Sequence, residues 1–571
     1  MSESLFRKKT IAQLTKEGNE PGHGGGLKRV LTARDLTFFG IAAILGAGSF
    51  SSLGGAIFGG GPGVVVLFII TGIACAFTAF CYSDFASRIP VAGSAYTYAY
   101  ASFGELFAWI IGWALIMEYS IGNIYVSFSW SDYFTSLLSR VGIDWPQYLC
   151  TSYMEAKHAF ENGSSNKDLI EAWTQAPLIG QLKFIIDLPA LVINALITWL
   201  VYVGVKESRN FSNLMVILKL GVVFLIILVG GYLVFTRGLT FNWFPALPDG
   251  NHSFMPNGFS GVMAAVAGVF FAYIGFDAVS VLAEESKDPQ RDLPRGMIYS
   301  LVICTVIYIL LTLVLSGAAD YRKFEGVGDP LAFIFESQQL DVPWMQLLVA
   351  ICAVVAMTSV LLVFQMGQPR IWMSMSRDGL LPNVFQRIHP KFKTPSFATI
   401  VTGFVVGLPI LFTDKTFVLD FTSIATLFAF VLVCGGVLLL PVKQKEEGKF
   451  NMPFFPSRVI FPVLMLTVIL ILMIFVPDYF PGLLNFQAAD ANATFQVSML
   501  CFWIISALLT IGAIIKNWSL VPLLGLVTCL YLLTGMTAMN WAWFGGWLLL
   551  GLVIYLLYGY KKSKLAQSEA E

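Results

Sequence analysis

Charged residues are scarce in this chain of 571 residues: Asp, Glu, Lys and Arg together make up only 12% of it. A water-soluble chain carries about twice that fraction. The 35 basic and 35 acidic residues also balance, so the chain lacks the positive surplus that is typical of a nucleic-acid binder. These two features exclude an ordinary cytosolic enzyme, a disordered scaffold and a nucleic-acid partner. Because 57% of the residues are hydrophobic, the sequence predicts an integral membrane protein surrounded by a lipid bilayer.

Histidine is equally scarce, and neither His nor Cys is clustered. The four histidines fall in predicted loops or termini, and seven of the eight cysteines lie inside apolar runs, with Cys150 in a polar loop. A membrane enzyme needs a nucleophile beside a base, or a set of metal ligands, at membrane depth. We therefore expect no enzyme activity, no catalytic residue, no metal and no cofactor.

Long apolar runs predict an all-α integral membrane fold with 14 spans, and twelve spans is the main alternative. The predicted spans are residues 35–58, 63–87, 104–138, 188–205, 210–235, 258–283, 296–317, 343–374, 396–413, 417–440, 458–476, 497–515, 519–537 and 541–560. They divide the chain into a cytoplasmic N-terminal segment (1–34), a polytopic membrane domain (35–560) and a cytoplasmic tail (561–571).

The distribution of Lys and Arg predicts the orientation in the membrane. With the N-terminus inside, 26 of the 35 basic residues fall on the cytoplasmic side and eight fall outside. Both termini are then cytoplasmic, and residues 139–187 form a long external loop. Because no apolar core follows the basic N-terminus at the distance typical of a signal peptide, we expect no cleavage. The predicted location is the cell (inner) membrane.

Glycines interrupt two of these spans near their centres. Gly46 and Gly48 lie in the first span, and Gly275 lies in the sixth, two residues before Asp277. A helix in hydrocarbon can unwind only where protein or water surrounds the freed backbone groups. Broken helices at matching positions of two five-helix halves indicate a transporter site, whose free N–H and C=O groups would bind the carboxylate and the ammonium of an amino acid. Close helix packing at these glycines is the alternative.

Several longer motifs carry a family resemblance. They are residues 81–100 (CYSDFASRIPVAGSAYTYAY), Gly104-Glu105, Gly112-Trp113, Glu118-Tyr119, residues 271–277, Ala283-Glu284-Glu285, residues 367–382 and residues 551–560. Through these motifs the chain resembles the cationic amino acid transporter family of the amino acid-polyamine-organocation superfamily. The resemblance runs from about Leu27 to Ser563.

This resemblance implies two inverted five-helix repeats, spans 1–5 and 6–10, followed by four C-terminal helices. It also implies a secondary active permease that moves an amino acid substrate across the cytoplasmic membrane by alternating access. By analogy, the substrate-binding residues are Ile44, Ala47, Gly48, Ser49, Phe271, Ala272 and Ile274. Phe271 would be an aromatic gate. The chain departs from the family pattern at Ala47, which lacks a hydroxyl donor, and at Ser49, which adds one, so the substrate preference of the family is not carried over.

Lys219 is an ionisable residue inside the fifth predicted span. A charged Lys at the centre of a span costs roughly 2.5 to 3.5 kcal/mol, so it needs a polar cavity or a partner. It resembles the family lysine that occupies a sodium position of sodium-coupled relatives. We therefore predict proton symport that is independent of sodium, with Lys219 as the coupling residue. Snorkelling to the cytoplasmic surface is the alternative.

Glu118 and Asp277 are acids at membrane depth. A carboxylate there has one of three roles: it contacts substrate, it takes part in coupling, or it pairs with a group on another helix. Glu118 is a candidate substrate-binding residue. It is also the only strong candidate to neutralise a cationic side chain, so we favour a neutral or small amino acid over arginine or lysine. A cationic amino acid uniporter or exchanger, and an amino acid sensor that transports nothing, are the alternatives.

Overall fold

The computed structural model describes residues 5, 7–10, 31–46, 48–89, 94–164, 166–179, 182–204, 209–247, 250–441, 449–484 and 493–566. Helices dominate these residues, and they confirm the all-α fold class. The described strands are β1 (Leu178–Ile179) and β2 (Leu182–Lys183), which form a small antiparallel hairpin in the predicted external loop. Of the predicted site residues, Ala47 lies outside the described residues.

Helices occupy every predicted span. The first part of the chain forms α2 (Ala33–Ile44), η1 (Gly48–Ser52), α3 (Leu53–Gly60), α4 (Val64–Arg88), α5 (Ser94–Ser102), α6 (Glu105–Arg140), α7 (Tyr153–Glu161), α8 (Lys167–Gln175), α9 (Leu188–Val203) and α10 (Arg209–Thr236). The middle part forms α11 (Gly258–Ala264), α12 (Val266–Phe271), η5 (Asp277–Glu285), α13 (Pro289–Ala318), α14 (Pro330–Phe333), α15 (Pro343–Arg377), α16 (Ser396–Ile410) and α17 (Lys415–Leu439). The last part forms α18 (Ser457–Phe475), α19 (Tyr479–Leu484), α20 (Ala493–Lys516), α21 (Leu520–Leu533), α22 (Ala538–Ile554), η8 (Tyr555–Gly559) and α23 (Tyr560–Lys562).

Within the described part of the chain, nine helical stretches are long and apolar enough to cross a membrane. One of them, Ala33–Arg88, contains two successive predicted spans. The helices α9, α16 and α21 are also apolar but shorter. The number of helices that cross the bilayer stays a prediction.

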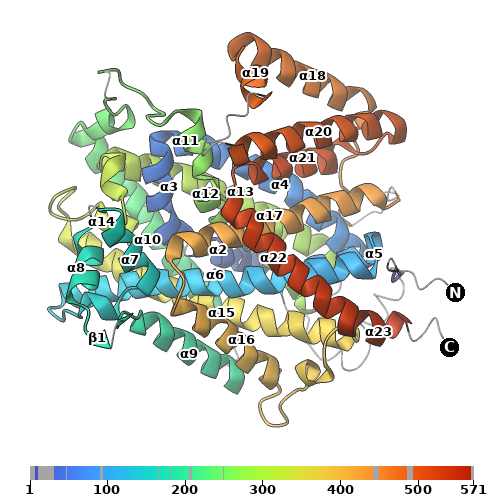
Figure 1. The fold of residues 1–571 in the computed structure, drawn as a ribbon, viewed down its shortest axis with the longest axis horizontal. Coiled ribbons are helices and arrows are strands. Elements are labelled where there is room, and N and C mark those ends of the chain that lie inside the picture. Colours follow the sequence, from blue (N-terminus) through green and yellow to red (C-terminus); the bar gives the residue numbers. More distant parts are fainter. Residues whose placement is uncertain are drawn as a thin grey trace.

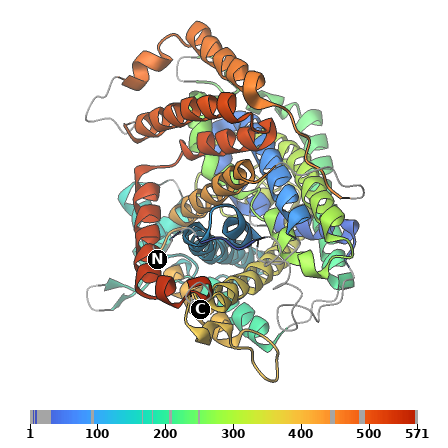
Figure 2. The ribbon, with the colours of Figure 1, turned by 90° about the vertical axis from the view of Figure 1, so that its right-hand side faces the viewer.

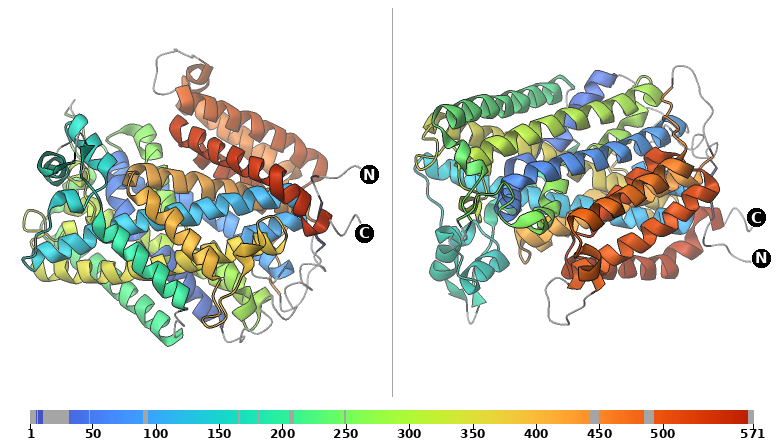
Figure 3. Two further views of the ribbon diagram at one scale, coloured as in Figure 1. Left: turned by 60° about the horizontal axis from the view of Figure 1, so that its bottom comes forward. Right: turned by 90° about the horizontal axis from the view of Figure 1, so that it is seen from above.

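The long helix α6 runs through the centre of the molecule. With 36 residues it spans about 54 Å. It packs against α15 and α17, while α13 packs against α2 and α4. Most helices share one long direction in Figure 3, and α7, α8 and β1 lie at the end of the molecule opposite α5 and α23 in Figure 1. The two ends of α6 therefore reach opposite ends of the protein.

The C-terminal helices α18 and α20 lie along one side of this bundle, at the top of Figure 2. They pack on each other and form a hydrophobic cluster separate from the main core. Only 11% of the apolar window of α18 is buried, as expected for a helix that faces lipid. The candidate site lies in the main core, away from this pair.

Candidate functional site

The first predicted span is interrupted at the expected position. The helix α2 ends at Ile44, and η1 begins at Gly48. At the break, the Gly46 N–H donates to the Ile44 carbonyl at 2.9 Å instead of continuing the α-helical pattern. The Ser49 hydroxyl donates to the Gly46 carbonyl at 2.9 Å. The break therefore frees carbonyl groups near the end of α2, because the N–H groups that would have bonded them point elsewhere.

The sixth predicted span is interrupted as well. The helix α12 ends at Phe271, and η5 starts at Asp277. Between them Gly275 has φ of 115°, a conformation that an L side chain rarely adopts. A Cβ at Gly275 would also lie 3.0 Å from backbone atoms of Ala43. This glycine therefore permits both the turn and the close approach of the two broken spans.

The two breaks are in direct contact. A Cβ added at Gly48 would lie only 2.5 Å from the Ala272 Cα. The buried hydroxyl of Tyr308, on α13, lies 2.8 Å from the Ile44 carbonyl oxygen and 2.7 Å from the Ala272 carbonyl oxygen. One phenolic proton is therefore shared between the ends of α2 and α12, and Tyr308 holds the two breaks together.

The structure brings most of the predicted substrate-binding residues to this contact. Ile44, Ser49, Phe271, Ala272 and Ile274 are all buried. They join Gly48 around the two breaks. The Phe271 ring lies edge to face with the Tyr125 ring of α6, with centroids 4.5 Å apart. The predicted gate residue therefore has an aromatic partner on the central helix.

Glu118 lies further along α6. It is buried, with 4% of its surface exposed, and is two turns from Tyr125, which corresponds to roughly 10 Å along the helix axis. It is close enough to the buried Asp277 for their charges to interact. Glu118 therefore interacts electrostatically with the first residue of η5.

Lys219 is buried rather than snorkelling, with 3% of its surface exposed. Its ammonium donates to the Ser359 hydroxyl at 2.6 Å and to the Ala42 carbonyl at 3.5 Å. In an unbroken helix the Gly46 N–H would bond the Ala42 carbonyl, but that N–H turns to Ile44 at the break. Lys219 thus connects the end of α2 to α15.

The partners of Lys219 lie close to the first helix break. Ser359 is a direct partner, but Tyr308 bonds the Ile44 carbonyl and the Thr358 hydroxyl accepts a hydrogen bond from an indole. Lys219 instead bonds a carbonyl two residues before Ile44.

A polar cavity of about 1070 Å³ opens toward the loop that carries α7 and α8. Its lining includes Ser51, Ser52 and Tyr125, which lie next to the two breaks. Seven acidic and two basic residues line it. One of them is Glu155 of α7, outside the predicted spans. Burial and then the neighbouring Asp132 charge raise the pKa of Glu155 to about 8.

Sequence reasoning missed Tyr308 and Tyr125. Both are tyrosines within otherwise apolar spans, and a buried phenol hydroxyl needs a hydrogen-bond partner. That signal marks them as residues with a polar role, although it does not identify their partners.

Comparisons with known proteins identify the class. The family model described as amino acid permease matches residues 31–488, which is more than half of the chain. This chain belongs to the amino acid permease family, and its resemblance to the cationic amino acid transporters is confirmed. It is an integral, multi-pass membrane transporter rather than an enzyme.

Individual relatives cover most of the chain. It is 36% identical to the branched-chain amino acid permease BcaP of Bacillus subtilis (strain 168), over 99% of this chain and 100% of that protein. It is 38% identical to the methylthioribose transporter of the same organism, over 79% of this chain and 89% of the relative. It is 35% identical to the vacuolar cationic amino acid transporter 2 of Arabidopsis thaliana, over 78% of this chain and 64% of the relative.

Proposed function

We propose that this permease is a sodium-independent, proton-coupled symporter of neutral amino acids that works by alternating access. The observation that carries the proposal is the contact between the two helix breaks, with Lys219 bound to the end of one of them. Broken helices that meet in a membrane domain provide unpaired N–H and C=O groups at one place.

The substrate would bind across these breaks. Its carboxylate would accept hydrogen bonds at the start of η1, where a helix N-terminus favours negative charge. The donors would be the Gly48 backbone and the Ser49 hydroxyl, which would leave the Gly46 carbonyl when substrate binds. Its ammonium would donate to carbonyls at the ends of α2 and α12. Ala47 belongs to this proposed site by its position in the sequence.

A neutral aliphatic side chain fits the surroundings best. Ile44, Phe271 and Ile274 are apolar and buried, so they would favour an apolar side chain over a charged one. The relative named a branched-chain amino acid permease matches this chain over nearly its whole length. We therefore place branched-chain amino acids first among the neutral substrates.

A cationic amino acid is the second candidate. Glu118 is buried on α6 and would be the carboxylate that neutralises a basic side chain. Several relatives are named cationic amino acid transporters. Against this candidate, Glu118 is about two helical turns from Tyr125, the aromatic partner of the gate.

Lys219 would couple transport to protons. When protonated, it donates to Ala42 and Ser359 and so holds the end of α2 against α15. When it loses its proton it carries one donor fewer and no charge, which weakens its hold on that end. A fixed cation at this position would also remove the need for sodium.

The membrane arrangement belongs to the same proposal. We place 14 spans in the cell membrane, with spans 1–5 and 6–10 as inverted repeats and both termini in the cytoplasm. The broken first and sixth spans support this repeat. The cavity near α7 and α8 would then be the entrance from outside.

The test is transport by the purified protein in sodium-free proteoliposomes. A thermal-shift screen against the twenty standard amino acids first selects the substrate, because a ligand that binds the folded state raises the melting temperature. We expect accumulation of L-leucine or a similar neutral amino acid when the outside is made acidic, and its loss with a protonophore. Binding without any uptake would favour the sensor, a requirement for sodium would refute the coupling, and preferred uptake of arginine would favour the second candidate.

A further inference from the structure

Tyr125 is one of the residues that line the polar cavity near α7 and α8, here called the outer cavity. Tyr125 and Ser51 line the cavity, and the Tyr125 hydroxyl donates to the Ser51 hydroxyl at 3.4 Å. Behind the ring lies Phe271, in edge-to-face contact at 4.5 Å between centroids. The Tyr125 ring therefore contacts both the cavity and Phe271 at the break in the sixth span.

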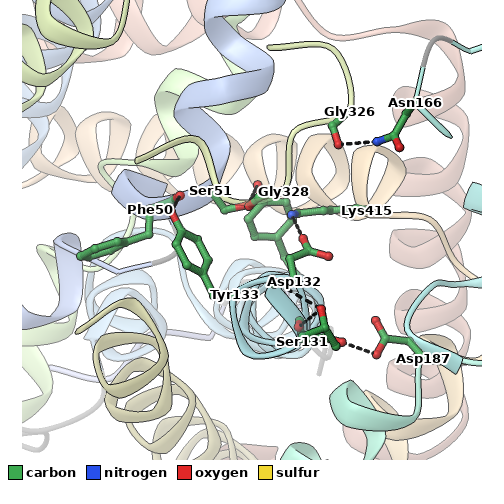
Figure 4. Close-up of polar contacts among 12 residues, drawn as sticks. Phe50, Ser51, Ser131, Asp132, Tyr133, Asn166, Asp187, Gly326, Gly328 and Lys415 are labelled. Atoms are coloured by element: carbon green, nitrogen blue, oxygen red, sulfur yellow. Dashed lines mark hydrogen bonds and ion pairs between the residues drawn. The ribbon is translucent and has the colours of Figure 1, made fainter. Parts of the chain in front are cut away.

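An ion pair lies directly above this ring. Lys415 is the first residue of α17, and its ammonium lies 5.6 Å from the centroid of the Tyr125 ring. The same ammonium pairs with the carboxylate of Asp132, two turns after Tyr125 on α6. Only 15% of the Lys415 side chain and 30% of the Asp132 side chain are exposed. Figure 4 shows Lys415 reaching across to Asp132.

A loop covers the ion pair from a third direction. Gly328, just before α14, is so close to Asp132 that an added Cβ would lie 2.6 Å from its carboxyl carbon. The Ser51 hydroxyl donates to the Gly328 carbonyl at 3.2 Å, as Figure 4 shows. The Asp132–Lys415 pair thus joins α6, α17 and the loop before α14, next to the first broken span.

We propose that Lys415 is a positioning residue that keeps the outer entrance closed by pairing with Asp132 and holding the Tyr125 ring against Phe271. This role rests on the proposed function. A cation over an aromatic face is attracted to it, and a partly buried ion pair is screened less by salt than an exposed one. Opening the entrance requires the Tyr125 ring to move. This movement breaks the cation–π contact between Lys415 and the ring, and it so separates the ring from the Asp132–Lys415 ion pair.

Substrate dissociation tests this role. Lys415→Met removes the charge, whereas Lys415→Arg keeps a cation that can pair with Asp132 and lie on the Tyr125 ring. We expect Lys415→Met to speed the dissociation of radiolabelled L-leucine from the purified protein by about fivefold to tenfold. Association should speed up similarly, so that Kd changes little. Lys415→Arg should restore slow dissociation, and the control Lys157→Gln, at an exposed pair on α7, should behave as the wild type.

A second measurement needs no substrate. Ser49 is fully buried in η1, two residues before Ser51 of the cavity lining, and Ser49→Cys is a nearly isosteric change. In a Cys150→Ser background, which removes the thiol that lines the cavity, a membrane-impermeant cationic methanethiosulfonate applied on the side of α7 reports access to position 49. Lys415→Met should raise the rate of modification about fivefold or more.

The outcomes separate this role from the proposed function. If Lys415→Met lowers the melting temperature but leaves both the dissociation rate and the modification rate unchanged, the residue is only structural and the inference is wrong. If the wild type binds no amino acid, the proposed function fails, and the cysteine measurement still decides whether Lys415 closes the entrance.

Discussion

Replacing Gly48 by alanine is the smallest change that tests the contact between the two helix breaks. The new methyl carbon would lie 2.5 Å from the Ala272 Cα and 3.1 Å from its backbone nitrogen. Carbon atoms in contact prefer about 3.5 to 4.0 Å, so the breaks would have to separate by about 1 Å. Neither atom belongs to a side chain that can rotate away.

The expected loss follows from the cost of overpacking. Such insertions cost typically 1 to 3 kcal/mol. If that cost falls on the state that binds substrate, affinity decreases by about fivefold to more than a hundredfold. Equilibrium binding of L-leucine to the purified Gly48→Ala protein measures the loss, and thermal unfolding shows whether the fold persists.

A matched glycine provides the control. Gly55 lies in α3, seven residues after Gly48, and an added Cβ there meets no atom within 4 Å. Gly55→Ala should therefore bind L-leucine as the wild type does and should unfold at the same or a slightly higher temperature. If Gly48→Ala also keeps wild-type affinity, the contact between the breaks does not shape the substrate site.

Two further variants test neighbouring features. Tyr308→Phe removes the hydroxyl shared by the Ile44 and Ala272 carbonyls, so the free energy of unfolding should fall by about 1 to 3 kcal/mol in denaturant titrations. Glu155→Gln should flatten the pH dependence of the melting temperature between pH 5 and pH 9. The folded protein raises the pKa of Glu155 to about 8, because it favours the neutral carboxyl. The contribution of this group to the free energy of unfolding is therefore fully present below its ordinary pKa and is lost as the pH rises through 8.

Each of these variants has a contradicting result. Tyr531→Phe is the control for Tyr308, since the Tyr531 hydroxyl has a weak contact, 3.8 Å from a methionine sulfur. Equal losses of unfolding free energy in the two tyrosine variants would show that the Tyr308 hydroxyl contributes no more stability than the weakly bonded Tyr531 hydroxyl. A Glu155→Gln protein that loses stability with pH as steeply as the wild type would show that another group titrates.

The sequence predicted the helices of the fold because apolar runs of membrane-spanning length carry a strong signal. It also predicted both helix breaks. Gly48 and Gly275 lie at membrane depth, where a helix can unwind only if protein or water surrounds the freed backbone groups. Lys219 was identified for a similar reason: a lysine within an apolar run needs a partner, and Ser359 is one.

The contacts between distant segments were not predictable in the same way. Lys415 lies just before the predicted span 417–440, yet it begins α17 and pairs with a residue 283 positions earlier. The Tyr308 hydroxyl bonds two backbone carbonyls, and whether a side chain can reach these carbonyls depends on the exact geometry of the breaks. Backbone carbonyls carry no sequence signal, which is also why Ala42 was missed as the partner of Lys219.

The most direct test of the account is the simultaneous measurement of amino acid and proton flux with Lys219→Met. Wild-type protein and the variant are reconstituted in sodium-free vesicles that contain a pH-sensitive dye, and L-leucine is added outside. We expect the wild type to acidify the vesicle interior as L-leucine enters. The variant should bind L-leucine and remain folded, but it should neither move protons nor accumulate substrate against its gradient. Proton-coupled accumulation by Lys219→Met would contradict the account.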